Sequence, residues 1–397
     1  MTALHRLREV AALATEGGIG ERPVLTLDGV ESGTGRLVDG WEPATSNEVP
    51  AGSSAARPGD VLFGKLRPYL AKSLLVQEPM YISTELLCIR ADESALDSRF
   101  LLRLIQAQPF LDWANATSEG VKMPRTSWEK LREFRFVLPG LRDQRRVTEF
   151  LSRELAEMDA VEAQLHEVRA LLGERARVAV STQTTPEGVA PVRLGRYCDL
   201  VTSGPRGWSE YVGAGPTPFF RSANLRRWAL QPSDAELVRV DPPKSSLVEG
   251  ARASTRVGDV LIGITGANTG WVCLCTPDLA GAVVSQHVAI IRPREGVLSG
   301  EWLAWSLLGG RAQDQFLAAQ YGGTKEQLSL PILRDLRLQI PSFDEQQSAV
   351  VRLRSLAQDL TEATAAVDAE LELLAERRQV LITEAVTDKL GWKGAAA

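Results

Sequence analysis

The chain is poor in the residues that build covalent or metal-bound frameworks. It contains four cysteines and three histidines in 397 residues, and neither type has the spacing of a disulfide framework or a zinc site. Cys273 and Cys275 alternate along an apolar stretch, which is typical of core or edge positions in a strand. The sequence therefore predicts no disulfide and no metal centre on this chain.

Long hydrophobic runs are also missing. No apolar run approaches the roughly 18 residues needed to cross a bilayer. The N-terminal segment "MTALHRLREVAALATEGG" is amphipathic and contains acidic residues, without the apolar centre of a signal peptide. These features predict a cytoplasmic protein. The net charge of −5 argues against a chain that grips DNA through its overall charge alone.

The usual catalytic constellations are absent as well. Residues 241–244 read "DPPK", with Lys244 where the similar motif of amino-methyltransferases has an aromatic ring. Residues 263–270, "GITGANTG", match neither a dinucleotide fingerprint nor a Walker loop, and we interpret them as a tight loop between two strands. We therefore predict that this chain alone is not an enzyme.

What the sequence does contain is a repeat. The phrase "VLPGLRDQR" at residues 137–145 returns as "QIPSFDEQQ" at residues 339–347, with Gln144 matching Gln346 at a separation of 202. Three further pairs of blocks match. They are "RPGDVLFGKLRPYLAKSLLV" with "RVGDVLIGITGANTGWVCLC", "ISTELLCIR" with "VSQHVAIIR", and "SEGVKMPRTSWEKLREFRFVLP" with "YGGTKEQLSLPILRDLRLQIP". Such self-similarity predicts two homologous modules.

Each half ends in a long helical pattern with apolar residues every seven positions. The phrase itself is a helix entry, because proline ends the preceding strand and acidic residues follow in the first turn. The predicted helices run from about residue 142 to 181 and from about 344 to 390. The heptad residues that form the contact seam between the helices are Leu151, Met158, Leu165 and Leu172 in the first helix. In the second helix they are Leu353, Leu360, Val367, Leu374 and Leu381. We favour antiparallel packing of the two helices; the alternative is that each packs only on its own half.

The rest of each half indicates an α+β module. Short β-rich runs such as "DVLFG" and "DVLIGIT" are broken by glycine and proline, and Gly59-Asp60 and Gly258-Asp259 are interpreted as turns before strands. One helix is predicted in each half, over residues 98–114 and 299–319. The predicted organisation is residues 1–140, module one; 141–181, helix one; 182–190, linker; 191–341, module two; 342–390, helix two; and 391–397, tail.

This arrangement resembles the specificity subunit of type I restriction-modification systems. The likeness rests on the "GDVL" blocks, "KLRPYL", "GTKEQLSLPILRDLRLQIPSFDEQQ" and the two terminal helices, and it covers essentially the whole chain. The entry "LPGLRDQ" departs from the family's more usual second proline and Glu-Gln. The resemblance implies two α+β target recognition domains separated by two long helices that form an antiparallel coiled coil with pseudo-two-fold symmetry.

The resemblance also implies a function. Each recognition domain would read one half of a bipartite, asymmetric DNA target, while the helices would space the domains and dock two methyltransferase (modification) subunits. This chain would carry no cofactor. S-adenosylmethionine would bind to the partner methyltransferases, which methylate adenine, and ATP and Mg would bind to a restriction motor and nuclease subunit.

Candidate DNA-binding residues come from the loops that flank the repeated strands. Arginine and lysine read guanine in the major groove, and asparagine and glutamine read adenine. The candidates are Lys65, Arg67, Tyr69, Lys122, Arg125, Arg221, Asn224, Thr265, Asn268, Thr269, Lys325 and Gln327. For each of them a surface or structural role is the alternative.

Three other functions remain open from the sequence. The chain could serve a related methylation-only or other phage-defence complex. It could be a coiled-coil scaffold that holds two ligand-binding domains and never binds DNA. It could also be a defence enzyme whose site the sequence does not reveal. Salt-dependent binding to duplex DNA beside a methyltransferase would separate a DNA-binding role from the scaffold, and activity of the isolated chain would support the enzyme.

Overall fold

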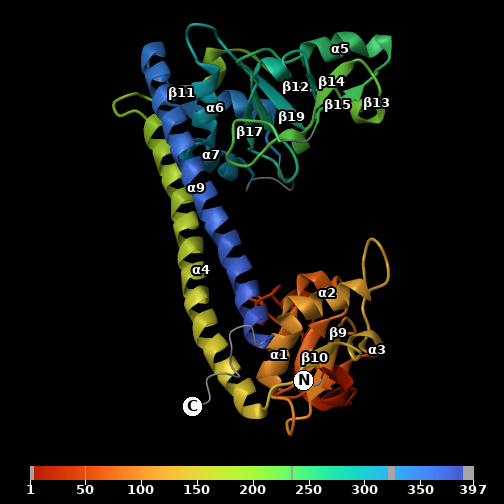
Figure 1. Cartoon of the computed structure of the whole chain (residues 1–397). Coiled ribbons are helices and arrows are strands. Elements are labelled where there is room, and N and C mark those ends of the chain that lie inside the picture. Colours follow the sequence, from red (N-terminus) through yellow and green to blue (C-terminus); the bar gives the residue numbers. More distant parts are fainter. Residues whose placement is uncertain (1–3, 50, 234–235, 321–326, 388–397) are drawn as a thin grey trace. The chain divides into compact units, whose positions relative to one another are not determined.

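The computed structural model describes residues 4–49, 51–233, 236–320 and 327–387 (Figure 1). Its contacts divide the chain into two compact units. Unit 1 comprises Met1–His166 with Asp368–Ala397, and unit 2 comprises Glu167–Val367. Each unit holds one globular module and a part of both long helices. We call the module before the first long helix the first module, and the module after it the second.

Two four-stranded sheets form the first module. The main sheet is antiparallel, in the order β2 (Ala11–Leu13), β9 (Leu86–Ala91), β6 (Val61–Gly64), β7 (Ser73–Leu75). The other sheet has the order β4 (Thr45–Glu48), β3 (Ile19–Leu25), β8 (Met80–Ile82), β5 (Ser54–Ala56). In it, β3 and β8 run parallel. A separate pair joins β1 (Leu4–Arg6) to β10 (Arg135–Val137).

The second module repeats the main sheet, while its other sheet differs at the edges. Its main sheet has the order β12 (Cys198–Ser203), β19 (Val288–Pro293), β16 (Val260–Gly263), β17 (Val272–Leu274). Its other sheet has the order β13 (Val212–Gly213), β15 (Val238–Val240), β14 (Thr217–Phe220), β18 (Val283–Val284). Here β14 and β18 run parallel, and β11 (Val192–Arg193) pairs with β20 (Arg337–Leu338). The duplicated sequence has therefore produced a duplicated fold.

Helices cover one face of each main sheet. In the first module α1 (Ser98–Gln106) packs on β6, β7 and β9, and in the second α6 (Gly300–Leu308) packs on β16, β17 and β19. The remaining short helices are α2 (Gln108–Ala116), α3 (Trp128–Leu131), α5 (Leu247–Arg252), α7 (Gly310–Gln320) and α8 (Leu330–Asp335). Apolar residues from the sheets and helices fill the cores, with Phe63, Phe100 and Trp302 fully buried.

The prediction of a single helix over residues 98–114, and of another over 299–319, was wrong. Each is two helices, broken at Ala107 and at Gly309, where the backbone is extended with ψ of 143° and 153°. Pro109 explains the first break, because its ring cannot fit inside a continuous helix. Glycine has the lowest helix propensity after proline, which explains the second break.

The matched "GD" turns are stabilised by a buried ion pair in each module. Gly59 and Gly258 have φ of 92° and 86°, a conformation that favours glycine. The carboxylate that follows accepts two hydrogen bonds from an arginine on the next strand of the sheet. Asp60 accepts from Arg90 at 2.7 and 2.8 Å, and Asp259 accepts from Arg292 at 2.8 and 2.7 Å. The interpretation of both sites as turns before strands is confirmed.

The duplicated helix entry is explained by a buried glutamine. Gln144 donates from Nε2 to the carbonyls of Ala95 and Pro139, both at 2.8 Å, and its Oε1 accepts from the amide of Asp97 at 2.8 Å. Gln346 does the same with Val297 at 3.0 Å, Pro341 at 2.9 Å and the amide of Ser299 at 2.7 Å. Both glutamines are fully buried. We call these two arrangements the glutamine locks, because each fastens a long helix to its module.

The long helices are α4 (Leu141–Thr184) and α9 (Phe343–Val386), yellow-green and blue in Figure 1. They run antiparallel within each unit. In unit 1 Asp159 of α4 meets Arg378 of α9, and in unit 2 Gln183 accepts a hydrogen bond from Arg352 at 2.7 Å. Among the heptad residues, Leu151, Met158 and Leu353 are buried, and the others are half-buried. The predicted α+β modules with two long antiparallel helices are confirmed.

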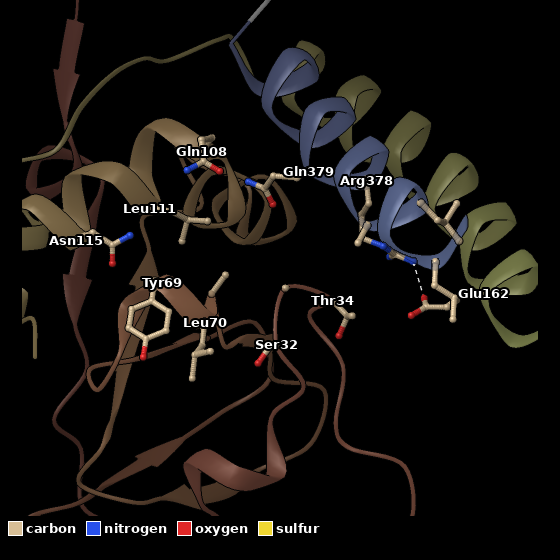
Figure 2. Close-up of a pocket in the computed structure, with 15 residues that line it drawn as sticks. Ser32, Thr34, Tyr69, Leu70, Gln108, Leu111, Asn115, Glu162, Arg378 and Gln379 are labelled. Atoms are coloured by element: carbon tan, nitrogen blue, oxygen red, sulfur yellow. Dashed lines mark hydrogen bonds and ion pairs between the residues drawn. The ribbon is translucent and has the colours of Figure 1, made fainter. Parts of the chain in front are cut away.

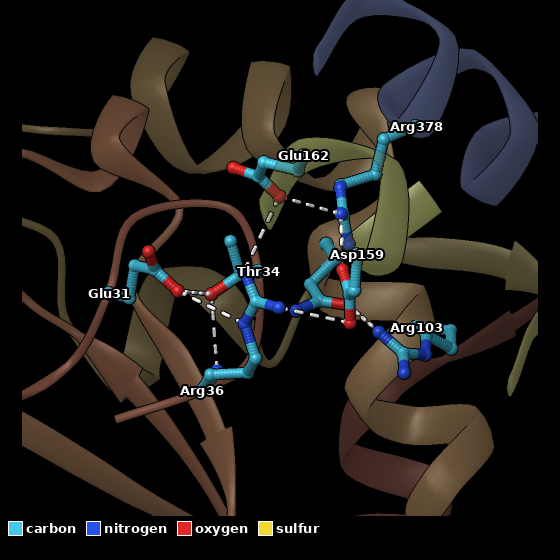
Figure 3. A network of polar contacts seen from close by, with 8 residues as sticks. Glu31, Thr34, Arg36, Arg103, Asp159, Glu162 and Arg378 are labelled. Carbon is cyan, nitrogen blue, oxygen red and sulfur yellow. Dashed lines mark hydrogen bonds and ion pairs between the residues drawn. The ribbon is translucent and has the colours of Figure 1, made fainter. Parts of the chain in front are cut away.

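In unit 1 an ionic cluster joins the first module to both helices (Figure 3). Arg36 of the module contacts Asp159 at 3.0 Å, Glu162 at 3.5 Å and Glu31 at 3.1 Å. Arg378 contacts the same Asp159 and Glu162, the latter at 3.1 Å, and is almost fully buried. Two carboxylates of α4 thus hold an arginine from the module and an arginine from α9.

Candidate nucleic-acid interface

Loops from three parts of the first module converge at the ends of β6 and β9. The amide of Lys65 donates to the carbonyl of Glu85 at 2.8 Å, and the amide of Thr126 donates to the carbonyl of Lys65 at 2.9 Å. The amide of Arg67 donates to the carbonyl of Pro124 at 2.7 Å. We call residues 64–67, 83–86 and 124–126 the first corner. It brings together the candidates Lys65, Arg67 and Arg125.

The second module has an equivalent arrangement. The amide of Ile264 donates to the carbonyl of His287 at 2.9 Å, and the amide of Leu328 donates to the carbonyl of Ile264 at 2.9 Å. Thr265 forms a bridge with Gln327, just as Leu66 does with Arg125. We call residues 263–266, 285–288 and 327–328 the second corner. It brings together the candidates Thr265 and Gln327.

The first corner is strongly charged. A guanidinium nitrogen of Arg125 lies 3.2 Å from a carboxylate oxygen of Glu85, and both side chains are exposed. Burial, and then the nearby charge of Arg125, lower the pKa of Lys65. Arg67 has a positive φ of 50°, which is strained for a residue with a side chain. Next to it lies an open cavity of about 550 Å³, whose lining includes Arg67, Lys72 and Glu85.

The second corner is polar but built from side chains without permanent charge. The Thr265 hydroxyl shares a hydrogen bond with Nδ1 of His287, and Nε2 of His287 lies 3.1 Å from the side-chain nitrogen Nε2 of Gln286. Gln327 is exposed beside them. The two modules therefore present different chemistry on the same backbone arrangement.

Three of the predicted readers use their side chains within the second module. Asn224 is buried, and its Oδ1 accepts from the amide of Arg221 at 2.9 Å. Asn268 donates to the carbonyl of Ser222 at 2.7 Å, and the hydroxyl of Thr269 donates to Gly266 at 2.6 Å. The bonds of Asn268 and Thr269 order the loop over residues 264–270, which lies between β16 and β17 as predicted.

The other predicted readers lie apart from the corners or outside the described residues. Tyr69 is exposed and lines a separate cavity of about 460 Å³, together with residues of α2, α4 and α9 such as Gln108, Glu162 and Gln379 (Figure 2). Lys122 is exposed on the loop before the first corner. Arg221 is half-buried at the end of β14. Lys325 lies outside the described residues.

The sequence reasoning missed Glu85 and His287, although a signal was present. They occupy the same place in the matched blocks "ISTELLCIR" and "VSQHVAIIR", between residues that agree in character. A position that differs sharply inside a matched frame shows where two modules have diverged. Neither residue belongs to a familiar motif, so only the repeat could have revealed them.

Neither corner resembles a metal site. In the described part of the chain, no group of three His, Cys, Asp or Glu side chains could hold a metal ion. The cysteines are unbonded, and burial raises the pKa of Cys198 and of Cys273 to about 12. Within the same residues, no helix has the length and apolar character that crossing a bilayer demands.

Comparisons with known proteins agree with this architecture. No family model matches the sequence. The type I restriction enzyme EcoBI specificity subunit of Escherichia coli is 24% identical over 343 residues, which are 78% of this chain and 69% of that protein. The EcoDI specificity subunit of the same organism is 25% identical over 137 residues, which are 34% of this chain and only 30% of that protein.

Solved structures share the fold over nearly the whole chain. A chain from a study of complex assembly and conformational transition of the type I R-M system is 22% identical, with a TM-score of 0.76 and coverage of 97% of both chains. The HsdS subunit from Thermoanaerobacter tengcongensis is 21% identical, with a TM-score of 0.50 and coverage of 97% of this chain and 96% of that chain. The predicted resemblance to type I specificity subunits is confirmed.

Proposed function

We propose that this chain, a relative of the type I restriction specificity subunits, is the sequence-specific DNA-binding subunit of a type I restriction-modification complex. Each module reads one half of a bipartite, asymmetric target. The long helices set the distance between the two halves and dock two methyltransferase subunits. The chain itself is not catalytic. S-adenosylmethionine belongs to the methyltransferase partners, and ATP and Mg belong to a motor and nuclease subunit where the complex restricts DNA.

The observation that carries this proposal is the duplicated module with a divergent corner. Both modules have the same strand order in their main sheets, the same Asp–Arg turn and the same glutamine lock. The scaffold was thus kept in both copies, while the exposed loops at the strand ends differ. Two related readers with different loops suit a target whose two halves differ in sequence.

The charge of the chain is compatible with this role. Lys65, Arg67 and Arg125 gather in the first corner although the whole chain is acidic. Phosphate contacts supply much of the affinity of proteins for DNA, and subunits that assemble on this chain add contacts of their own. Part of the affinity for DNA can therefore come from other subunits, whereas the choice of target sequence comes from this chain.

A module exchange tests the proposal. Residues 191–340 are replaced by the matching module of another specificity subunit, and the methylated motifs of a host that carries the complex are mapped before and after. We expect one half of the motif to change and the other half to stay the same. A change in both halves, or a wild-type chain on which no methylated motif depends, would contradict the proposal. The second outcome is the one a scaffold without a DNA role would give.

A further inference from the structure

The two corners have one backbone frame and two kinds of side chain. In both, a strand-end amide donates to the turn carbonyl, from Lys65 to Glu85 and from Ile264 to His287. In both, the next loop donates back to the same strand end. In this backbone frame Glu85 is therefore equivalent to His287, and Arg125 is equivalent to Gln327.

The first corner presents an anchored guanidinium. Glu85 engages one nitrogen of Arg125 at 3.2 Å, which limits the rotamers of this exposed side chain. The rest of its planar fork of N–H donors remains available. Such a fork matches the O6 and N7 acceptors of guanine in the major groove.

The second corner presents a primary amide. Gln327 is exposed beside the hydrogen-bonded Thr265 and His287. An amide both donates and accepts, which matches the N7 acceptor and the N6 donor of adenine. No arginine or lysine occupies the second-corner residues 263–266, 285–288 and 327–328. Gln327 is therefore the candidate base reader among these described residues.

Both corners also contain buried hydroxyl groups without partners among the described residues. They are the Oγ of Ser83 and the Oγ of the equivalent Ser285, together with Oγ1 of Thr126 in the first corner. Buried polar groups in proteins nearly always have a hydrogen-bond partner. The glutamine locks and the Asp–Arg turns satisfy their own groups, as structural clusters do. Other unpartnered buried atoms among the described residues lie elsewhere, at Arg221, Trp302, Trp305 and Gln339, so this feature does not by itself mark the corners.

We propose that these corners set the base preference of each half of the target. In the first module Arg125, positioned by Glu85, selects a G·C pair. In the second module Gln327, beside His287, selects an A·T pair. The proposal rests on the DNA-binding function proposed above, and it adds Glu85 as a positioning residue.

The test exchanges the two corners. Arg125→Gln with Glu85→His gives the first corner the residues of the second, and Gln327→Arg with His287→Glu does the reverse. Each full-length variant is purified with its methyltransferase partners and used to select from a random duplex library. We expect one base pair of one half-site to change, from G·C to A·T or the reverse, with about a tenfold or larger change in preference. The other half-site stays as in the wild type.

The matched control is Arg6→Gln with Glu133→His. It makes the same chemical change at a surface ion pair of 3.1 Å in the same module, away from the corner, and it should leave the whole motif unchanged. Arg125→Lys is a milder variant that keeps the charge but not the fork. It should weaken the preference for guanine while the thermal unfolding midpoint stays at the wild-type value.

The outcomes separate the two proposals. A wild-type complex that selects no bipartite motif overturns the DNA-reading function itself. If the wild-type complex selects a motif and a corner variant selects that same motif in both halves, only the assignment of the corners is overturned. A control variant that shifts the motif as strongly as the corner exchange also overturns that assignment.

Discussion

Replacing Gln346 by leucine should detach the first turn of α9 from the second module. Leucine has a similar volume, so the change removes hydrogen bonds without opening a large cavity. Three bonds of 2.7 to 3.0 Å are lost, which leaves one amide and two carbonyls in a fully buried place. Each lost bond costs about 1 kcal/mol, and unpaired buried groups add to this. We expect a loss of roughly 3–5 kcal/mol from a total that is typically about 5–15 kcal/mol.

Hydrogen–deuterium exchange of the full chain measures this effect where it arises. The amide of Ser299 donates to the side chain of Gln346, so its exchange should accelerate in Gln346→Leu by about 100-fold or more. Amides of the first module should keep their wild-type rates. Gln144→Leu should show the opposite distribution, with faster exchange at Asp97. Urea unfolding followed by circular dichroism gives the accompanying change in stability.

Gln347→Leu is the matched control, because Gln347 is the next residue on the same helix and is exposed. It should leave the exchange rate at Ser299 at the wild-type value and the free energy of unfolding within about 0.5 kcal/mol of the wild type. Equal behaviour of Gln346→Leu and Gln347→Leu would refute the glutamine lock as an energetic feature.

Two further predictions concern ion pairs of unit 1. Burial by itself would raise the pKa of Asp60, but the hydrogen bonds from Arg90 and from the Arg57 amide outweigh it and hold that pKa below 3.8. The stability that the ionised Asp60 contributes is complete above pH 3.8 and is lost as the pH falls through the depressed pKa. Asp60→Asn should therefore lower the urea midpoint at pH 7. The urea midpoint of this variant should also fall less steeply than that of the wild type as the solution is made acidic. Arg378→Met should destabilise unit 1 by about 2–4 kcal/mol in urea unfolding, because two carboxylates lose their buried partner. The exposed neighbour variant Arg377→Met should change the midpoint little, and equal losses would contradict the ionic cluster.

Much of the architecture could be predicted because the sequence contains an internal repeat, so each pattern occurs in both halves. The heptads required long helices, and the structure has them over Leu141–Thr184 and Phe343–Val386. The "GD" pairs were recognised as turns because a strand pattern follows each of them. The breaks in the short helices were missed, although Pro109 was a visible signal. The apolar periodicity on both sides of it concealed the break.

The candidate site was less predictable, because hydrogen-bonding capacity does not reveal where it is used. Asn224 and Asn268 have the side chains that read adenine, yet both bond to the backbone of their own module. Glu85 is of neither the guanine-reading nor the adenine-reading type, yet it holds Arg125. Only tertiary contacts distinguish a side chain that orders a loop from one that remains exposed.

The main-chain bonds of the two corners have a consequence for how such a protein can evolve. Because Lys65 and Ile264 reach Glu85 and His287 through backbone atoms alone, the frame does not depend on which side chains stand at these positions. If the modules read DNA as proposed, a single codon change can therefore alter what one module recognises without disturbing this frame. New target sites become accessible in small genetic steps, one half at a time.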